Sequence, residues 1–100
     1  IALPDYQIAK GILTVNKDLR QEIDMAFDQA CRELLTNPEK SLKIDLSCVS
    51  YISSTYVGMI AVTFFQAQAS GKTLTIRAKP AVLRVLKVAG FEGFLHLEPI

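Results

Sequence analysis

The feature that most constrains the fold is a change in hydrophobic period at three consecutive hydroxyl side chains, Ser53, Ser54 and Thr55. Before them, apolar and polar residues alternate over residues 42–46, which is typical of a strand with one buried face. After them the chain is almost entirely apolar up to Ala69, which is typical of a helix that is deeply buried or packed against a partner. The sequence therefore predicts a strand, a loop with a hydroxyl at the helix N-cap, and a helix from Thr55 to about Ala69.

Another amphipathic helix is predicted upstream, with Asp18 as its N-cap and Gln21 as the capping-box partner. It ends at Asn37, because Pro38 cannot continue a helix. Its apolar residues recur at intervals of three and four and so form one stripe, whereas charged side chains occupy the other side. The stripe consists of Leu19, Ile23, Ala26, Phe27, Ala30, Cys31 and Leu34.

A third helix is predicted near the end of the chain. It begins at Pro80, since proline at the first helical position loses no hydrogen bond, and it stops at Gly90. Arg84 and Lys87 are expected to face outward. The inner stripe is expected to consist of Val82, Val85, Leu86 and Ala89.

The predicted strands indicate a two-layer architecture. Strands 42–46 and 73–77 both alternate apolar with polar residues, so each buries one face only, whereas strands covered on both faces are apolar throughout. A further strand is expected at 11–15, with an edge strand near 6–9 and a short strand or extended tail at 94–97. The prediction is one α/β domain over residues 1–100, with a mixed sheet of four or five strands and about three to four helices mainly on one face.

Composition and spacing argue against several classes of function. The formal net charge of +1 gives no case for direct binding of nucleic acid, and no apolar run is long enough for membrane insertion. Cys31 and Cys48 form no CxxC pair and lie in apolar segments, which predicts two buried, reduced thiols in a cytoplasmic protein. His96 is the only histidine, so no histidine pair can bind a metal, and a Ser-His-Asp triad would have to recruit it from the far end of the chain. We therefore expect no enzymatic activity and no cofactor.

The basic residues are distributed unevenly. No Asp or Glu occurs between Leu46 and Phe91, whereas the same interval holds five basic residues. These are either a solvated face or a docking field for an acidic partner or a phosphate-bearing ligand such as a nucleotide. The five are Lys72, Arg77, Lys79, Arg84 and Lys87.

Several segments together resemble the STAS domain family. The segment from Asp45 to Gly58, DLSCVSYISSTYVG, is similar to the family pattern DLSxVxFIDSSGLG. Ser70-Gly71-Lys72 resembles the paired glycines that precede a strand in the family, and the segment from Pro80 to Phe91 is similar to PxVxxxLxxxGL. The resemblance covers nearly the whole chain. The family comprises bacterial anti-sigma factor antagonists, related regulators and the cytoplasmic domains of sulphate-type anion transporters.

The resemblance implies a small STAS-like α/β fold and a regulatory, non-catalytic function. In the antagonists, a partner that is both a serine kinase and an anti-sigma factor phosphorylates a serine at the start of the second helix, and a metal-dependent serine/threonine phosphatase reverses this. The unphosphorylated antagonist binds the kinase and frees the sigma factor. On this chain the phosphoacceptor position falls on Ser54, with Thr55 as the second choice. The resemblance leaves room for a weak homodimer, and the implied partner-binding residues are Ser53, Ser54, Thr55, Tyr56 and Met59.

Two positions depart from the family pattern. Ser53 stands where an acidic residue is usual, and Tyr56 stands where a small glycine is usual. The first loses a carboxylate that could orient the acceptor or a kinase-bound metal, and the second adds a ring beside the acceptor. The alternative hypothesis is therefore a divergent STAS interaction domain that serves a membrane transporter without a phosphoswitch. In that case Ser54 would be a plain N-cap whose hydroxyl accepts a backbone N–H.

Overall fold

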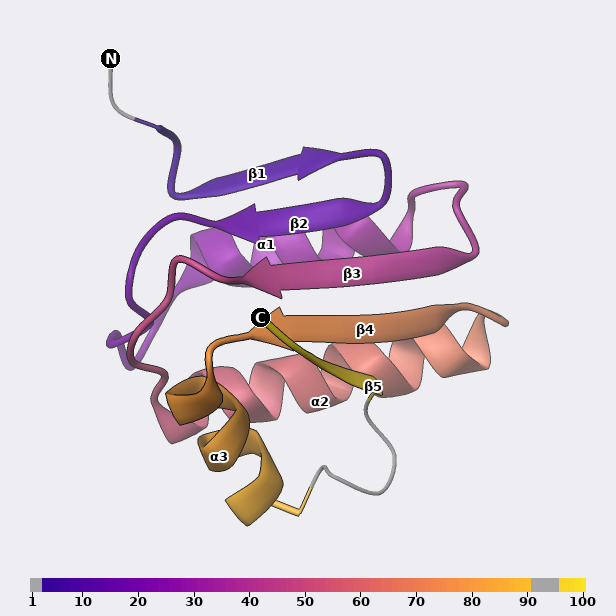
Figure 1. Cartoon of the computed structure of the whole chain (residues 1–100). Helices are drawn as coiled ribbons and strands as arrows, with labels where there is room; N and C mark the ends of the chain where they lie inside the picture. Colours follow the sequence, from indigo (N-terminus) through magenta and orange to yellow (C-terminus); the bar gives the residue numbers. More distant parts are fainter. Residues whose placement is uncertain (1–2, 91–95) are drawn as a thin grey trace.

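The computed structural model describes residues 3–90 and 96–100, which form one five-stranded sheet and three helices (Figure 1). The predicted numbers of strands and helices are confirmed. The last strand was expected at 94–97 and is found at His96–Pro99; residues 94 and 95 lie outside the described residues. The strands are β1 (Tyr6–Ala9), β2 (Ile12–Val15), β3 (Ser41–Leu46), β4 (Thr73–Ala78) and β5 (His96–Pro99), and the helices are α1 (Met25–Leu35), α2 (Ser54–Ala69) and α3 (Pro80–Val88).

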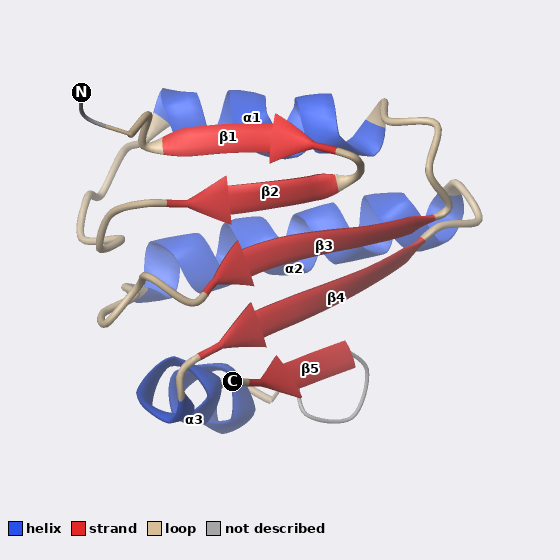
Figure 2. Cartoon of the chain, turned by 45° about the horizontal axis from the view of Figure 1, so that its top comes forward, coloured by secondary structure: helices blue, strands red, loops and turns tan. Residues whose placement is uncertain are grey.

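The order of the strands explains why the helices gather on one face. β1 is antiparallel to β2, whereas β2, β3, β4 and β5 are parallel neighbours in sequence order. Crossovers between parallel strands are right-handed in almost all proteins. Each crossover here leads to the next strand on the same side, so all the crossover helices are brought to one face of the sheet. On that face α1 and α2 lie side by side (Figures 1 and 2). α3 lies at the end of this layer beside β5 (Figure 2). The predicted two-layer α/β fold is confirmed.

The core lies between the sheet and the helices. Every second side chain of β3 and β4 is buried, and the parallel register sets Leu42 beside Leu74 and Ile44 beside Ile76. Phe27 of α1 packs on this layer and is fully buried. Burying a side chain of this size contributes roughly 1.5–3 kcal/mol. The alternation in the sequence therefore identifies the buried face of both central strands.

The other face of the sheet carries ion pairs in place of helices. Lys43 of β3 lies 3.1 Å from a carboxylate oxygen of Glu98 on β5. Arg77 of β4 lies between them and approaches Asp45 at 3.8 Å and Glu98 at 3.6 Å. Opposite charges on neighbouring strands add modestly to strand pairing and suit a surface that stays in contact with water.

The first helix begins later than the sequence indicated. α1 starts at Met25 with Asp24 as its N-cap, and Asp18 does not cap it. The Asp18 carboxylate instead accepts a hydrogen bond from Ser50 N, and Leu19 forms an isolated parallel bridge with Ile52. Tertiary pairing therefore outweighs the local capping signal. The expected stripe is wrong at Ile23, which is 79% exposed, and at Ala26, which is also exposed; Phe27, Ala30, Cys31 and Leu34 are buried as predicted.

Two further burial expectations are wrong. In α3 the buried residues are Val82, Leu83 and Leu86, whereas Val85 is 38% exposed and Ala89 is also exposed. The helix is rotated so that Leu83, the larger side chain, faces the core. Cys31 is buried as predicted, but Cys48 is exposed, because it lies in the turn that follows β3.

The Asp24 carboxylate ties α1, α2 and β1 together. It accepts a hydrogen bond from the backbone N–H of Phe27 at 2.8 Å, which caps α1, and one from the Tyr56 hydroxyl of α2 at 2.6 Å. The Tyr6 hydroxyl of β1 donates to it as well. The Phe27 ring lies edge-on between the two tyrosine rings, at 5.4 Å from Tyr6 and 5.1 Å from Tyr56. Lys17 Nζ stands 3.7 Å from the carboxylate and is the nearest opposite charge.

These contacts keep Asp24 ionised. Burial by itself would raise its pKa, but the hydrogen bonds from Tyr56, Tyr6 and the Phe27 N–H, with the charge of Lys17, lower it below the ordinary value. The tyrosines respond in the opposite sense. Burial, together with their hydrogen bonds to the carboxylate, raises the pKa of Tyr56 to about 12 and raises that of Tyr6 further. The carboxylate is therefore the acceptor and the hydroxyls are the donors at every physiological pH.

Asp24→Asn is expected to lower the free energy of unfolding by about 1–3 kcal/mol at pH 7, because the replacement leaves buried hydroxyls without a charged acceptor. The lowered pKa fixes the sign of the pH dependence. Wild-type stability from this group is complete above the ordinary pKa of 3.8 and is lost as the pH falls through the lower folded-state pKa. Urea unfolding of both proteins between pH 7 and pH 3 should therefore show a difference that shrinks toward acid.

Two variants serve as controls for this prediction. Asp28→Asn removes an exposed carboxylate of the same helix, which pairs only with Arg32, and should cost less than about 1 kcal/mol. Tyr56→Phe keeps the ring but removes one donor and should cost about 1 kcal/mol. An Asp24→Asn protein with an unchanged urea midpoint at pH 7 would contradict the assignment.

Candidate functional site

The three hydroxyls lie at the edge of the sheet where the parallel strands end. The loop from 47 to 53 leaves the carboxyl end of β3 and leads into α2, and ligands and partners of open α/β sheets commonly bind at this edge. Leu19 N donates to Tyr51 O, and Ser53 N donates to Leu19 O, both at 2.9 Å. The loop is therefore held in place by a segment that lies more than thirty residues earlier in the chain.

Asp18 and Arg20 add side-chain contacts to this brace. The Asp18 carboxylate accepts the Ser50 N–H at 2.7 Å, and this hydrogen bond is the main reason that the pKa of Asp18 is lowered. The Arg20 guanidinium lies over the Tyr51 ring at 4.4 Å from its centre. Such cation–π contacts stabilise exposed aromatic rings by about 0.5–1 kcal/mol. Residues 18–20 thus hold the loop before the hydroxyls by both backbone and side-chain contacts.

Ser53 occupies the N-cap position of α2, in agreement with the prediction that one of the hydroxyls would stand there. Its backbone carbonyl accepts the N–H groups of Tyr56 and Val57. Its side chain makes no capping bond, and its Oγ is buried with no hydrogen-bond partner among the described residues. A buried, unpaired hydroxyl is uncommon and costs stability. Ser53 therefore contributes to the helix start through its backbone and not through its hydroxyl.

Ser54 and Thr55 are the first two residues of α2, and both are exposed. Within the described part of the chain the Ser54 hydroxyl makes no hydrogen bond, so it is not the N-cap acceptor that the alternative hypothesis assigned to it. α2 carries no charged side chain along its whole length. The partial positive charge of the helix N-terminus is therefore not neutralised by an acid in the first turn.

The structure separates the remaining two predicted partner-binding residues. Tyr56 is fully buried and points inward to Asp24, so its side chain is not available to a partner, contrary to what its place beside the acceptor led us to expect. Met59 is half-buried and lies one turn further along the outer side of α2. Thr55 and Met59, one turn apart, both line the groove described next, whereas Ser54 is exposed on the first turn of the same helix and Tyr56 is buried.

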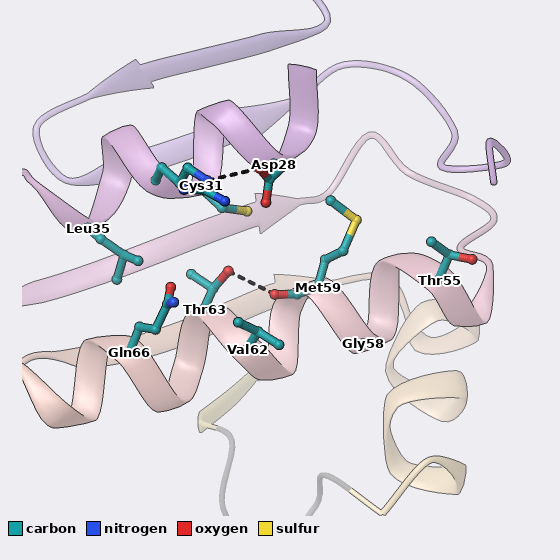
Figure 3. Close-up of a pocket in the computed structure, with 10 residues that line it drawn as sticks. Asp28, Cys31, Leu35, Thr55, Gly58, Met59, Val62, Thr63 and Gln66 are labelled. Carbon is teal, nitrogen blue, oxygen red and sulfur yellow. Dashed lines mark hydrogen bonds and ion pairs between the residues drawn. The ribbon is translucent and has the colours of Figure 1, made fainter. Parts of the chain in front are cut away.

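A groove runs between α1 and α2 from this surface, with a volume of about 590 Å³ (Figure 3). Thr55 lies at one end, and Met59 points from α2 toward α1 (Figure 3). The Arg32 guanidinium pairs with Asp28 at 2.9 Å on the α1 wall, so the only charged side chains of the lining neutralise each other. The α1–α2 groove is lined by Asp28, Cys31, Arg32, Leu35, Thr55, Gly58, Met59, Val62, Thr63 and Gln66.

Exposed apolar side chains surround the start of the groove. Ile23 and Met25 are 79% and 80% exposed, and both line a shallow hollow that also includes Met59. Val62, on the next turn of α2, is 56% exposed. We call Ile23, Met25, Met59 and Val62 the apolar patch. Contiguous exposed apolar patches are often binding sites, so this cluster is the candidate binding surface. The sequence did not indicate that Ile23 and Met25 are exposed. Ile23 fits the apolar stripe of a helix that begins after Asp18, whereas α1 begins only at Met25.

Gly58 has no structural requirement within the chain. A Cβ at this position would meet nothing within 4 Å, and its backbone is helical. Glycine inside a helix costs roughly 1 kcal/mol relative to alanine. Because neither packing nor backbone conformation demands it, the missing side chain leaves space on the outside of α2, where another molecule can approach the backbone closely.

The structure offers no metal site or membrane-spanning helix in the part that it describes. No group of three or more His, Cys, Asp or Glu side chains is placed to hold a metal ion among residues 3–90 and 96–100. None of the described helices is long and apolar enough to cross a bilayer.

Comparison with solved structures finds several similar chains, including two anti-sigma factor antagonists. An anti-sigma factor antagonist from Mycobacterium paratuberculosis matches with a TM-score of 0.79 and 21% identity, over 100% of this chain and 92% of that one. A proposed anti-sigma factor antagonist from Thermotoga maritima matches with a TM-score of 0.75 and 22% identity, over 93% of this chain and 83% of that one. At this identity the likeness establishes the fold.

Comparison with curated protein sequences finds no match. A domain family described as "Mlab, STAS domain" matches residues 5–98, which include every strand and helix of the structure except Pro99, the last residue of β5. The match runs through the braced loop, the hydroxyls and α2. The chain therefore belongs to the STAS domain family.

Proposed function

We propose that this chain is a regulatory binding module of the anti-sigma factor antagonist type, switched by phosphorylation of Ser54. The partner is a serine kinase that is also an anti-sigma factor, and a serine/threonine phosphatase resets the switch. The observation that carries the proposal is the exposed Ser54, whose hydroxyl makes no hydrogen bond with any described residue and which stands on the first turn of an uncharged helix, one turn before Met59 of the apolar patch.

The electrostatics of α2 suit a reversible phosphate. A phosphoserine carries about −1.5 to −2 charges at pH 7. At the N-terminus of α2 this charge meets the positive end of the helix dipole and no acidic side chain in the first turn. The domain itself is therefore expected to stay folded when modified. The partner, docked across the apolar patch, would have to bury a dianion at the edge of its interface, which is costly.

Ser54→Ala is expected to abolish phosphate incorporation when the protein is incubated with the cognate kinase and ATP, with the product measured by intact-protein mass spectrometry. Ser50→Ala is the matched control, because Ser50 is an exposed serine in the same loop and should leave incorporation unchanged. Thr55→Val shows whether Thr55 is the acceptor instead, because it would then abolish phosphate incorporation while Ser54→Ala would not. Phosphate on neither Ser54 nor Thr55 of the wild type would exclude the switch, and Ser54→Asp with unchanged affinity for the kinase would exclude its mechanism.

Substitutions in the apolar patch test the docking surface apart from the switch. Met59→Ser and Met25→Ser are each expected to weaken binding of the unphosphorylated protein to its kinase partner about fivefold to thirtyfold, since truncating a well-packed interface residue costs about 1–2 kcal/mol. Calorimetry provides the measurement. Leu3→Ser, which removes a 69% exposed side chain outside the patch, should leave the affinity within twofold. Equal losses in all three variants would argue against a localised surface.

A second candidate function is a STAS interaction domain that serves a membrane transporter without phosphorylation. Ser53 favours it, because it supplies no carboxylate beside the acceptor and its own Oγ is turned into the protein. The apolar patch would serve such a partner equally well. Binding to the cytoplasmic part of a transporter that is unaffected by Ser54→Ala and Ser54→Asp, together with no phosphate incorporation, would favour this candidate over the switch.

A further inference from the structure

The outer face of α3 carries basic side chains that have no acidic partner in the described part of the chain. Arg84 and Lys87 are exposed and take part in no ion pair with any described residue. Lys79, the N-cap residue of α3, is half-buried, and its ammonium reaches only the Ser50 hydroxyl, at 3.2 Å. Elsewhere in the described structure the basic side chains of the sheet are paired with carboxylates, as Lys43 and Arg77 are. Among the described residues, the charge on α3 is therefore not compensated by a carboxylate.

These bases border a hollow between α3 and β5. The hollow has a volume of about 360 Å³, and its lining combines the stems of Arg84 and Lys87 with Pro80, Leu83 and Pro99. The three uncharged lining residues are apolar. On the same helix, Val88, one turn after Arg84, is 82% exposed, and Val85 is 38% exposed. The α3 face, defined as this hollow with the two valines, thus joins an apolar floor to a rim of two unpaired cations.

We propose that the α3 face docks an extended acidic segment of a partner protein, in which two carboxylates and one apolar side chain occupy three successive alternate positions. Arg84 and Lys87 are three residues apart on the helix, so their side chains project on neighbouring positions about 5–6 Å apart at Cβ. In an extended segment, alternate side chains point to the same side and are about 7 Å apart. Two carboxylates at alternate positions can therefore meet the two cations while the apolar residue at the next alternate position, on the same side of the segment, enters the hollow.

Three other anionic ligands fit the face less well. A membrane surface would be expected to meet large aromatic or leucine side chains, whereas the exposed apolar residues of α3 are valines. A single-stranded nucleic acid would need aromatic rings for base stacking, and the described residues that line this hollow include none. A free phosphate or nucleotide would need donors on the floor, where the structure has proline and leucine side chains. The apolar floor and the separated cations favour a peptide.

This docking surface is independent of the proposed phosphoswitch. It contains none of Ser54, Thr55 or the apolar patch, and it would operate whether or not Ser54 accepts phosphate. A chain with both surfaces could hold two partners, or two segments of one partner, at the same time. The test below therefore includes a variant of the apolar patch, so that failure of one proposal is distinguishable from failure of the other.

The test uses the intact chain and a fluorescein-labelled eight-residue peptide with glutamate at positions 2 and 4, leucine at position 6 and serine elsewhere, titrated by fluorescence anisotropy at low salt. The double variant Arg84→Gln/Lys87→Gln is expected to weaken peptide binding about fivefold or more, because two partly exposed ion pairs are lost. The double variant Lys10→Gln/Lys40→Gln is the matched control. It removes the same charge from two exposed lysines outside the α3 face and should change the affinity less than twofold.

Two further variants complete the test. Val88→Ser should weaken binding of the peptide about twofold to fivefold, since it removes exposed apolar surface from the α3 face. Met59→Ser, in the apolar patch, should leave peptide binding unchanged. Thermal unfolding of each variant confirms that it is folded, which is expected because all these positions are at least partly exposed.

Several outcomes would overturn the proposal. Equal weakening in the two charge variants would mean that the peptide responds to net charge only, and no saturable binding below 1 mM would mean that the face has no affinity for this chemistry. Amide NMR signals of α3 and β5 provide the last criterion. If vesicles with 30% anionic phospholipid, or ATP, shift those signals at lower concentration than the peptide does, the face binds that ligand and not an acidic protein segment.

Discussion

The contact on which much of this structure depends is the one between the Asp24 carboxylate and its donors. This single ionised group caps α1. It also accepts hydrogen bonds from the Tyr56 hydroxyl, on the first turn of α2, and from the Tyr6 hydroxyl of β1. The two helices and the edge strand are thereby fixed relative to one another by hydrogen bonds to a charged acceptor, which are stronger than neutral ones. The position of Ser54, two residues before Tyr56, depends on this contact. A buried tyrosine in place of the family's usual glycine thus orients the helix start from beneath.

The surface of the candidate site is assembled from segments that are distant in sequence. Asp18 and Leu19 hold the loop that leads to Ser53, and the residues that follow them, Ile23 and Met25, supply the exposed apolar side chains next to Met59. The stretch before α1 therefore serves both to brace the hydroxyl loop and to extend the binding surface. Had α1 begun at Asp18, these residues would have followed the helix and the loop would have lost its brace.

Much of the fold is predictable from the sequence because its strongest signals are local. Alternation along β3 and β4 identified one buried face, and the period change at Ser53 located the start of α2 to within one residue. The errors arose where long-range contacts override local signals. Asp18 has the pattern of an N-cap, yet its carboxylate accepts from Ser50, thirty-two residues away, and Tyr56 is buried because Asp24 provides an acceptor that no spacing rule indicates. The rotation of α3 about its axis, which buries Leu83 and exposes Val85, depends on how the helix packs against β5. Helical periodicity in the sequence does not define that packing.

The glycine on the outside of α2 has a consequence for how such a domain evolves. Gly58 has free space around it and a helical backbone, so alanine would fit and would stabilise the isolated helix. The same methyl group would fill the space in which the backbone of a binding partner can approach α2. Under the proposed function, folding and recognition select in opposite directions at this one position, and a chain optimised for thermal stability alone would not keep the glycine. A relative that has lost Gly58 would then be expected to keep the fold and to bind its partner less closely.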